Sequence, residues 1–504
     1  MSNTVYFNGT IVMSLDVAIN SPEIIDVQKM PSIAKTLIIP TSVYSQRLSQ
    51  WEDEDTDRGA SAIELSSYLD YITYHSAIEK VSDDGITFRY TYPDSGDTLL
   101  LVPSKREAGN SSSQTTIKLA KDYDADIITS KASMITDART QGINAHLLKP
   151  DIYSGYRNVF LPESLHGIWT TTKHCFTAAE WCKYFDEEPL RPNEFIEFSF
   201  APPERPRYHN YNNIGWFNPR TGCLEHLQYF NSRLCPPGIR PRNALQAMAF
   251  EAAYAPPERL AVVVFYGNAG SGKTYISLGS AVAQTNFPSK KISSERVYQG
   301  QNTKRRKKQH GNNAEMNEDA FGDSCGIQKP YNEIWCCPPD RMMGENLGAV
   351  PGDRFQKQKD KLDGYVHNLQ VFLAAQHCRK TGGEEMNFRD IHAKAESYCS
   401  RINITSPGQI NGDSFSNTVL LIDEAEFMKE AQIRTFIERI ADGSKIFICG
   451  DPTQIRNPYG WYGNPLAKAV RRLAGDPQVA ILRFDRDEDI QRPGARIANR
   501  CWGK

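Results

Sequence analysis

The chain has 504 residues, with 58 Lys and Arg against 60 Asp and Glu, so its formal net charge at pH 7 is −2. At about 100–200 residues per domain, this length predicts two to four domains. The composition, 40% hydrophobic and 23% charged, is globular and excludes a collagen, a mainly disordered chain and a small disulfide scaffold. It also excludes a uniformly basic nucleic-acid coat, so any nucleic-acid surface must be a local patch.

Residues 1–165 alternate strand-like and helix-like segments, which is typical of a small parallel α/β domain. The expected strands are 9–15, 36–40, 97–103 and 126–130, and the expected helices are 59–71, 113–122 and 132–141.

Residues 166–237 are rich in proline and aromatic residues, so we expect a Pro-rich linker or small β subdomain there. The α/β pattern returns over 238–504. An insertion at about 288–330 interrupts it with a basic block and then an acidic one, and has few apolar residues on which to fold. The basic block is Lys304, Arg305, Arg306, Lys307 and Lys308. It is either a solvated loop, or a nucleic-acid contact or targeting signal.

The chain contains no run of about 18 apolar residues, so we expect no membrane span. Its start lacks the basic and apolar segments of a secretory signal. The 11 cysteines are an odd number without any CxxC pair, which indicates reduced thiols. These features predict a cytoplasmic protein.

The strongest motif is 267-GNAGSGKT-274, which follows the apolar run 261–266 and precedes a helical segment at 275–284. It fits the phosphate-loop pattern G-x-x-x-x-G-K-[ST], in which backbone N–H groups and a helix N-terminus surround a phosphate chain. The expected ATP-binding residues are Gly267, Asn268, Ala269, Gly270, Ser271, Gly272, Lys273 and Thr274. Lys273 would reach the β- and γ-phosphates, and the Thr274 hydroxyl would hold Mg²⁺.

A second apolar strand, 419–422, ends at Asp423 and Glu424. Ligands of open α/β sheets bind at this carboxyl end of the strands. Asp423 would hold Mg²⁺ and Glu424 would polarise the attacking water. The alternative is a simple helix start, because acidic residues suit the first helical turn.

A third apolar strand, in 444-SKIFICGDPTQI-455, ends at Asp451 and Gln454. A glutamine at this point can sense the γ-phosphate and report its loss. Hydrolysis also needs a positive charge near the leaving phosphate, for which Arg492, Arg439 and Arg456 are candidates.

The ordered set GNAGSGKT, LLIDEAE and GSKIFICGDPTQI resembles the PhoH family of ATPases, relatives of the superfamily 1 helicase core. The likeness covers about 238–500 and implies a RecA-like P-loop domain that hydrolyses ATP with Mg²⁺, binds RNA or another single-stranded nucleic acid, and forms a homo-oligomer, by resemblance a hexameric ring. Segment 238-GIRPRNALQ-246 resembles the family's GI.PRN..Q and indicates Gln246 as a reader of adenine. Segment 484-FDRDEDIQRP-493 resembles the family's DVVRHP and indicates Arg492.

The sequence departs from the PhoH pattern at two arginines. The family's TRP is replaced by 337-CPP-339 and its GRTF by 412-GDSF-415. Arginines at strand ends are candidates for backbone contacts with nucleic acid, so their loss weighs against strand unwinding more than against ATP hydrolysis.

Residues 1–160 resemble a PIN domain, a Mg²⁺- or Mn²⁺-dependent RNA nuclease fold that needs several convergent carboxylates. The four acidic positions are lost or displaced here. Ser14 replaces the first acid, with Asp16 two residues further on, and the segments 43–48, 110–114 and 130–132 contain no acid at the other three positions. We therefore expect a degenerate PIN-like module that binds or assembles without cleaving.

These observations leave three functions open. The first is a Mg²⁺-dependent ATPase coupled to the binding or remodelling of RNA. The second is an ATP-switched regulatory or assembly protein that remodels no nucleic acid. The third is an ATPase-coupled PIN ribonuclease, in which Asp16 would be essential.

Overall fold

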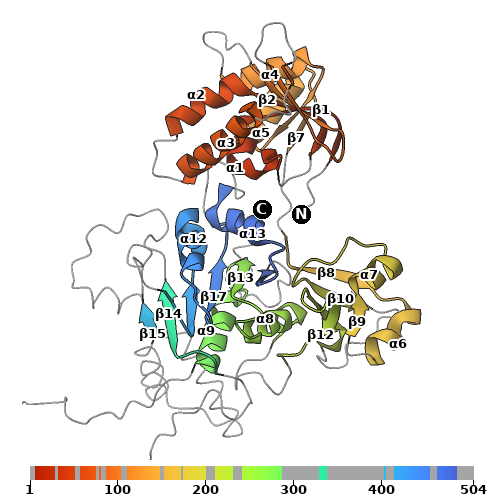
Figure 1. Ribbon diagram of the computed structural model, residues 1–504, viewed down its shortest axis with the longest axis vertical. Coiled ribbons are helices and arrows are strands. Elements are labelled where there is room, and N and C mark those ends of the chain that lie inside the picture. Colours follow the sequence, from red (N-terminus) through yellow and green to blue (C-terminus); the bar gives the residue numbers. More distant parts are fainter. Residues whose placement is uncertain are drawn as a thin grey trace, which may run out of the picture.

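Three β-sheets organise the computed structural model, and all three carry α-helices around them (Figure 1). The structure describes residues 6–28, 32–51, 57–74, 79–80, 87–103, 111–147, 153–171, 174–199, 211–230, 241–285, 329–337, 402–404, 414–454 and 463–484. The mixed α/β class expected from the sequence is confirmed. No helix within these ranges is long and apolar enough to cross a membrane.

The first sheet has the strand order β3-β4-β5-β2-β1-β6-β7. Its five strands from β5 to β7 pair in parallel, while β3 and β4 add an antiparallel edge. The strands are β1 (Phe7–Met13), β2 (Ala34–Pro40), β3 (Glu79–Lys80), β4 (Phe88–Thr91), β5 (Thr98–Val102), β6 (Asp126–Thr129) and β7 (Ala145–Leu147). All four expected strands of this region are present within two residues of their predicted starts.

Of the five α-helices that the structure describes in the first unit, the last three were expected from the sequence and the first two were not. The five helices are α1 (Leu15–Asn20), α2 (Thr41–Trp51), α3 (Asp57–Tyr74), α4 (Ser112–Asp122) and α5 (Ala132–Thr140). At the start of α4, the Gln114 backbone N–H donates to Ser111 Oγ, and the Ser111 backbone N–H donates to Gln114 Oε1. This reciprocal cap satisfies two backbone donors and sets where α4 begins.

The middle of the chain forms a five-stranded sheet of order β8-β10-β11-β12-β9. Its strands are β8 (Tyr156–Phe160), β9 (His174–Thr177), β10 (Phe195–Ser199), β11 (Ile214–Asn218) and β12 (Cys223–His226), and α6 (Glu163–Thr171) and α7 (Ala178–Tyr184) accompany them. Strand β8 pairs with β10 and so belongs to the middle sheet. The expected limit of the first domain at residue 165 would have assigned β8 to the first unit. The buried aromatic side chains Trp169, Phe176, Trp181 and Phe198 form part of its own core.

The third sheet has the order β15-β14-β16-β17-β13-β18, and all its pairs are parallel. Its strands are β13 (Val262–Gly267), β14 (Glu333–Cys337), β15 (Ile402–Ile404), β16 (Thr418–Ile422), β17 (Lys445–Gly450) and β18 (Val479–Phe484). The helices are α8 (Ala244–Tyr254), α9 (Lys273–Gln284), α12 (Glu430–Glu438) and α13 (Pro465–Leu473). Every residue of β13, β16 and β17 is buried, as expected for parallel strands covered on both faces.

The second and third sheets share one hydrophobic core, which contains Phe195 and Trp216 of the middle sheet together with Phe250 and Phe265. The carboxylate of Glu251 on α8 also links the third unit to the segment that follows the middle sheet. Its oxygens accept hydrogen bonds from the backbone N–H groups of Gln228, Tyr229 and Phe230, at 2.7, 2.9 and 2.5 Å. The middle segment therefore forms a small β unit packed against the third unit, which matches the expected β subdomain and not the expected linker.

The edge strand β18 also contacts the segment before β8. The Arg483 N–H donates to the Ser154 carbonyl at 2.9 Å, and Gly155 passes so near that a Cβ there would meet the Ile481 carbonyl oxygen. With φ at 81°, position 155 requires glycine for both reasons.

Helix α13 joins the third unit to the first (Figure 1). The Arg471 guanidinium donates to Glu23 Oε1 at 3.1 Å and to the Asn20 carbonyl at 3.0 Å. The buried Lys468 ammonium donates to Ser61 Oγ at 2.5 Å. Basic residues of one helix thus hold α1 and α3 of the first unit.

Candidate functional site

The loop between β13 and α9 has the backbone that a phosphate loop needs. Gly267, Gly270 and Gly272 have φ values of 123°, 76° and 98°, which side chains with a Cβ rarely adopt. Gly267 is also packed against the end of β18, where a Cβ would lie 2.7 Å from the Phe484 carbonyl oxygen. Gly272 directly precedes α9, so the loop places a helix N-terminus beside its own N–H groups.

The side chain of Lys273 is folded back into this loop. Its ammonium donates to the carbonyl oxygens of Gly267 and Asn268 at 2.7 and 2.8 Å, and only 9% of the residue is exposed. Burial lowers the pKa of Lys273, while the nearby carboxylate of Asp451 opposes this change. The ammonium group therefore lies inside the loop. A phosphate bound there would accept the hydrogen bonds that the two carbonyl oxygens accept in this structure.

Thr274 and Asp423 come together although they lie far apart in sequence. The Thr274 hydroxyl donates to Asp423 Oδ1 at 2.9 Å. Thr274 lies in the first turn of α9, after β13, and Asp423 directly follows β16, so the contact crosses the intervening strand β17. Burial raises the pKa of Asp423, and the Thr274 hydrogen bond opposes that change. A hydroxyl and a carboxylate are the hard oxygen donors that Mg²⁺ prefers, so this pair fits the ion.

Glu424 has an exposed side chain and a strained backbone. Its φ of 50° and ψ of 46° place a residue with a side chain in the left-handed region. Its N–H donates to Asp423 Oδ1 at 3.1 Å. Partial desolvation of its carboxyl group and then the neighbouring Asp423 raise the pKa of Glu424, the direction that favours a proton acceptor. Strain of this kind concentrates at functional sites.

The turn after β17 is held by Asp451. Its Oδ1 accepts from the N–H and hydroxyl of Thr453 at 3.0 and 2.6 Å, and its Oδ2 accepts from the Gln454 side-chain amide at 3.3 Å. Gln454 is therefore brought to the same edge of the sheet as the phosphate loop, with its amide folded onto Asp451.

Sequence reasoning missed Glu426, which is 1% exposed. A Cβ at Gly450 would lie 2.3 Å from its Oε2, and this oxygen has no hydrogen-bond partner among the described residues. Burial raises the pKa of Glu426 to about 8. In the sequence it is one acid among several in 423-DEAE-426, and nothing there distinguishes it.

Gln246 lies against the phosphate loop with its amide engaged. Its Oε1 accepts from the Arg242 N–H at 2.9 Å and its Nε2 donates to the Ser271 carbonyl at 3.3 Å. The predicted contact with adenine would require these bonds to be exchanged, and it stays a prediction.

Of the positively charged candidates, only Arg439 lies among the residues that the structure describes. The Arg439 carbonyl accepts from the Phe415 N–H at 2.9 Å, beside the start of β16 and so at the opposite edge of the sheet, and the structure does not bring this residue to the site. Arg492 and Arg456 lie outside the described residues, as do Lys304, Arg305, Arg306, Lys307 and Lys308.

Comparisons with known proteins place the family likeness in the same region. Residues 325–499 match the family model described as PhoH-like protein, a range that contains Asp423, Glu424 and Gln454 and begins after the phosphate loop. Protein PhoH2 of Bacillus subtilis is 23% identical over 345 residues, covering 67% of this chain and 62% of its own. Protein PhoH of Escherichia coli K12 is 26% identical over 170 residues, covering 33% of this chain and 43% of its own.

A structural comparison gives a domain of a functionally unknown protein from Methanocaldococcus jannaschii, with 18% identity and a TM-score of 0.20, covering 29% of this chain and 94% of that one. The chain covers less than two thirds of the length of each of the two PhoH relatives, from Bacillus subtilis and Escherichia coli. The sequence matches support a likeness to PhoH-family proteins, which the family model places at residues 325–499.

Proposed function

We propose that the protein hydrolyses ATP at the carboxyl edge of the third sheet and couples this reaction to RNA or another single-stranded nucleic acid. The observation that carries the proposal is the Thr274–Asp423 hydrogen bond, because it joins the predicted phosphate loop to the predicted acidic strand end. The glycines with positive φ around Lys273 support the same reading.

In this mechanism the phosphate-loop N–H groups and Lys273 bind the β- and γ-phosphates of ATP. Thr274 and Asp423 would hold Mg²⁺, which neutralises charge on the phosphates when bound. Glu424 accepts a proton from the attacking water, consistent with its raised pKa. Gln454, in the turn held by Asp451, reports whether the γ-phosphate is present. Arg492, from this chain or a neighbouring subunit, would stabilise the transition state.

The nucleic-acid part of the proposal rests on the PhoH likeness and on the basic block Lys304 to Lys308. A ring of six chains would present that block several times, which strengthens a weak contact. The PIN-like first unit would serve as a binding or assembly module. The proposed units are 1–152, 153–240 and 241–504, with the insertion at about 288–330.

The test is the rate of ATP turnover with and without single-stranded RNA. Wild type should turn over faster with RNA, and Glu424→Gln should lose about 100-fold or more of its rate in both conditions. Glu438→Gln, an exposed partner of Arg434, is the matched control and should behave as wild type. Turnover that RNA never changes would favour an ATP-switched assembly protein instead. Metal-dependent RNA cleavage lost on Asp16→Asn would favour the ribonuclease.

A further inference from the structure

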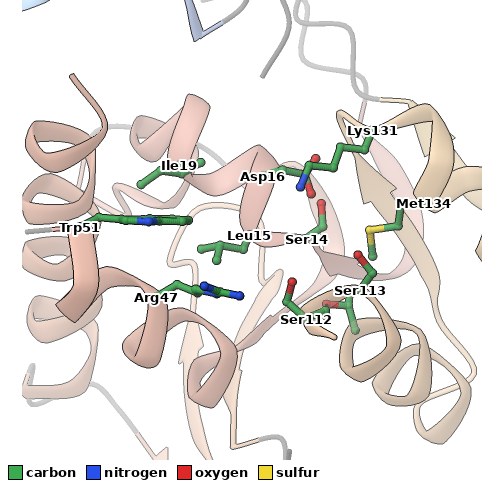
Figure 2. A pocket seen from close by; sticks show the side chains of 11 residues that line it. Ser14, Leu15, Asp16, Ile19, Arg47, Trp51, Ser112, Ser113, Lys131 and Met134 are labelled. Carbon is green, nitrogen blue, oxygen red and sulfur yellow. The ribbon is translucent and has the colours of Figure 1, made fainter. Parts of the chain in front are cut away.

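The first unit contains a pocket of about 170 Å³ where β1 ends and α1 and α4 begin (Figure 2). One water occupies about 30 Å³, so the pocket has room for a tetrahedral anion. The polar side chains that line it are Ser14, Asp16, Arg47, Ser112, Ser113, Thr116 and Lys131. They come from four different parts of the first unit that converge on one point.

Ser14 is the strongest sign that the pocket holds a ligand. The residue is 1% exposed, it lines the pocket, and its Oγ has no hydrogen-bond partner among the described residues. Although Ser14 precedes α1, its side chain makes no cap hydrogen bond to that helix. A buried hydroxyl without a partner is unfavourable, so a group in the pocket that accepts its hydrogen bond would remove this cost.

The surroundings of Ser14 suit a negatively charged group. Ser112 and Ser113 form the first turn of α4, an 11-residue helix whose N-terminus favours anions. Arg47 points toward this turn from α2 (Figure 2), with one of its nitrogens donating to Gln50 Oε1 at 3.2 Å. Lys131 adds a second positive charge from the segment after β6.

The same residues do not suit a divalent cation, the cofactor that a PIN fold implies. Asp16 is the one carboxylate of the pocket lining, and its Oδ2 already accepts from Thr129 Oγ1, Ser130 N and Ser130 Oγ at 3.0, 2.6 and 2.6 Å. Divalent metal sites need several convergent carboxylates. The described parts of the chain contain no group of three or more His, Cys, Asp or Glu able to hold a metal ion.

We propose that this pocket binds a phosphate group, carried by an RNA strand or a nucleotide, without a metal ion and without cleaving it. Ser14, Ser112 and Ser113 donate to the phosphate oxygens, and Arg47 and Lys131 supply the positive charge. Trp51, at the same pocket with Leu15 and Ile19, offers an apolar side on which the attached base stacks. The inference deepens the proposed function, because it gives the first unit a ligand and a site.

The experiment measures binding by the full chain in EDTA, without ATP. The probes are a 5′-phosphorylated RNA oligonucleotide, the same oligonucleotide with a 5′-hydroxyl group, and AMP. The affinity for each probe is compared between wild type and variants, because the phosphate loop contributes equally to binding in both. Arg47→Ala should weaken binding about tenfold, the loss of one charge-assisted hydrogen bond. Arg139→Ala, an arginine in the last turn of α5 outside the pocket, should bind as wild type.

The three probes separate the sources of the phosphate. Preference for the 5′-phosphorylated strand indicates a terminal phosphate, equal affinity indicates an internal phosphodiester, and an effect of Arg47→Ala on AMP alone indicates a free nucleotide. If Arg47→Ala and Ser14→Ala bind all three probes as wild type does, the proposal is wrong.

Two further variants guard against a loss of folding. Ser14→Ala should weaken binding while leaving the thermal midpoint unchanged or higher, because it removes an unpaired buried hydroxyl; a purely structural role would lower the midpoint. Ser14→Asp should abolish phosphate binding by repulsion. If Ser14→Asp instead leaves phosphate binding intact and wild type takes up Mn²⁺ with RNA cleavage, the pocket is a metal site and the proposal fails. ATP turnover by Lys273→Ala is measured separately, so the two proposals can fail independently.

Discussion

The Thr274 hydroxyl lies 2.9 Å from Asp423 Oδ1, and this contact joins the phosphate loop to the end of β16 across the intervening strand β17. Both oxygens are placed by backbone that the sequence constrains strongly, the start of α9 on one side and a fully buried strand on the other. The pair is the centre of the proposed Mg²⁺-dependent chemistry.

The first prediction removes the hydroxyl of this pair while keeping its shape. Thr274→Val should lower the rate of ATP hydrolysis on the order of 100-fold and raise the Mg²⁺ concentration needed for half-maximal turnover, because one oxygen ligand is lost. Thr274→Ser keeps the hydroxyl and should retain most activity. Equal rates for the valine and serine variants would show that the hydroxyl has no such role.

The second prediction concerns the attachment of the middle sheet to α8. Glu251→Gln replaces one carboxylate oxygen with an NH₂ group, which faces backbone N–H groups that donate to Glu251 in the wild type. We expect a loss of about 2–3 kcal/mol in the free energy of unfolding, measured by urea denaturation. Glu438→Gln, on an exposed surface, should change it by less than about 0.5 kcal/mol. A Glu251→Gln protein as stable as wild type would contradict the packing of residues 153–230 against the third unit.

The third prediction is a dependence of stability on pH through Glu426. Burial raises its pKa from the ordinary value of 4.5 to about 8 in the folded protein, so the protonated form stabilises the fold. This contribution is fully present below about pH 4.5 and is lost as pH rises toward 8, by up to about 1.4 kcal/mol per pH unit.

The variant Glu426→Gln cannot titrate and provides the comparison for this effect. The free energy of unfolding of wild type minus that of Glu426→Gln should fall from pH 5 to 8 and then stay level. A difference that is flat with pH, or that rises over this range, would show that Glu426 is ionised in the folded protein.

The fourth prediction tests the contact between the first unit and α13. Arg471, whose side chain is 8% exposed, pairs with Glu23 and also donates to the Asn20 carbonyl. Arg471→Ala should weaken this docking by about 1–3 kcal/mol and speed proteolytic cleavage between β7 and β8. Arg434→Ala removes a solvent-exposed ion pair with Glu438 and should leave the cleavage rate unchanged. Equal cleavage of both variants would argue against a docked first unit.

Much of this fold could be predicted because its strands are short, apolar and parallel. Clear apolar runs in the sequence correspond to β1, β2, β5, β6, β13, β16 and β17. The glycines of 267–274 were expected to allow backbone conformations with positive φ, and three of them have such values. The middle sheet was harder to predict, because its segments alternate with prolines. It also buries aromatic residues such as Trp216 in a core shared with α8, which only the tertiary fold creates.

The site was predictable where a residue's chemistry follows from its own motif, as for Lys273 and Asp423. It was not predictable where the role depends on a distant neighbour. Glu426 reads as one acid among several in 423-DEAE-426, and only its packing against Gly450 reveals a buried carboxyl. Ser14 stands where the family has an acid, and only the structure shows that its unpaired hydroxyl lies in a pocket that Arg47 and Lys131 also line.

The most direct test of the central claim is steady-state ATP turnover by Lys273→Ala in the full chain. Its ammonium is placed within the phosphate loop, 2.7 Å from the Gly267 carbonyl oxygen. We predict that the variant loses about 100-fold or more of the wild-type rate, because the charge that binds the β- and γ-phosphates is gone. A Lys273→Ala protein that hydrolyses ATP at the wild-type rate would contradict the assignment of this site.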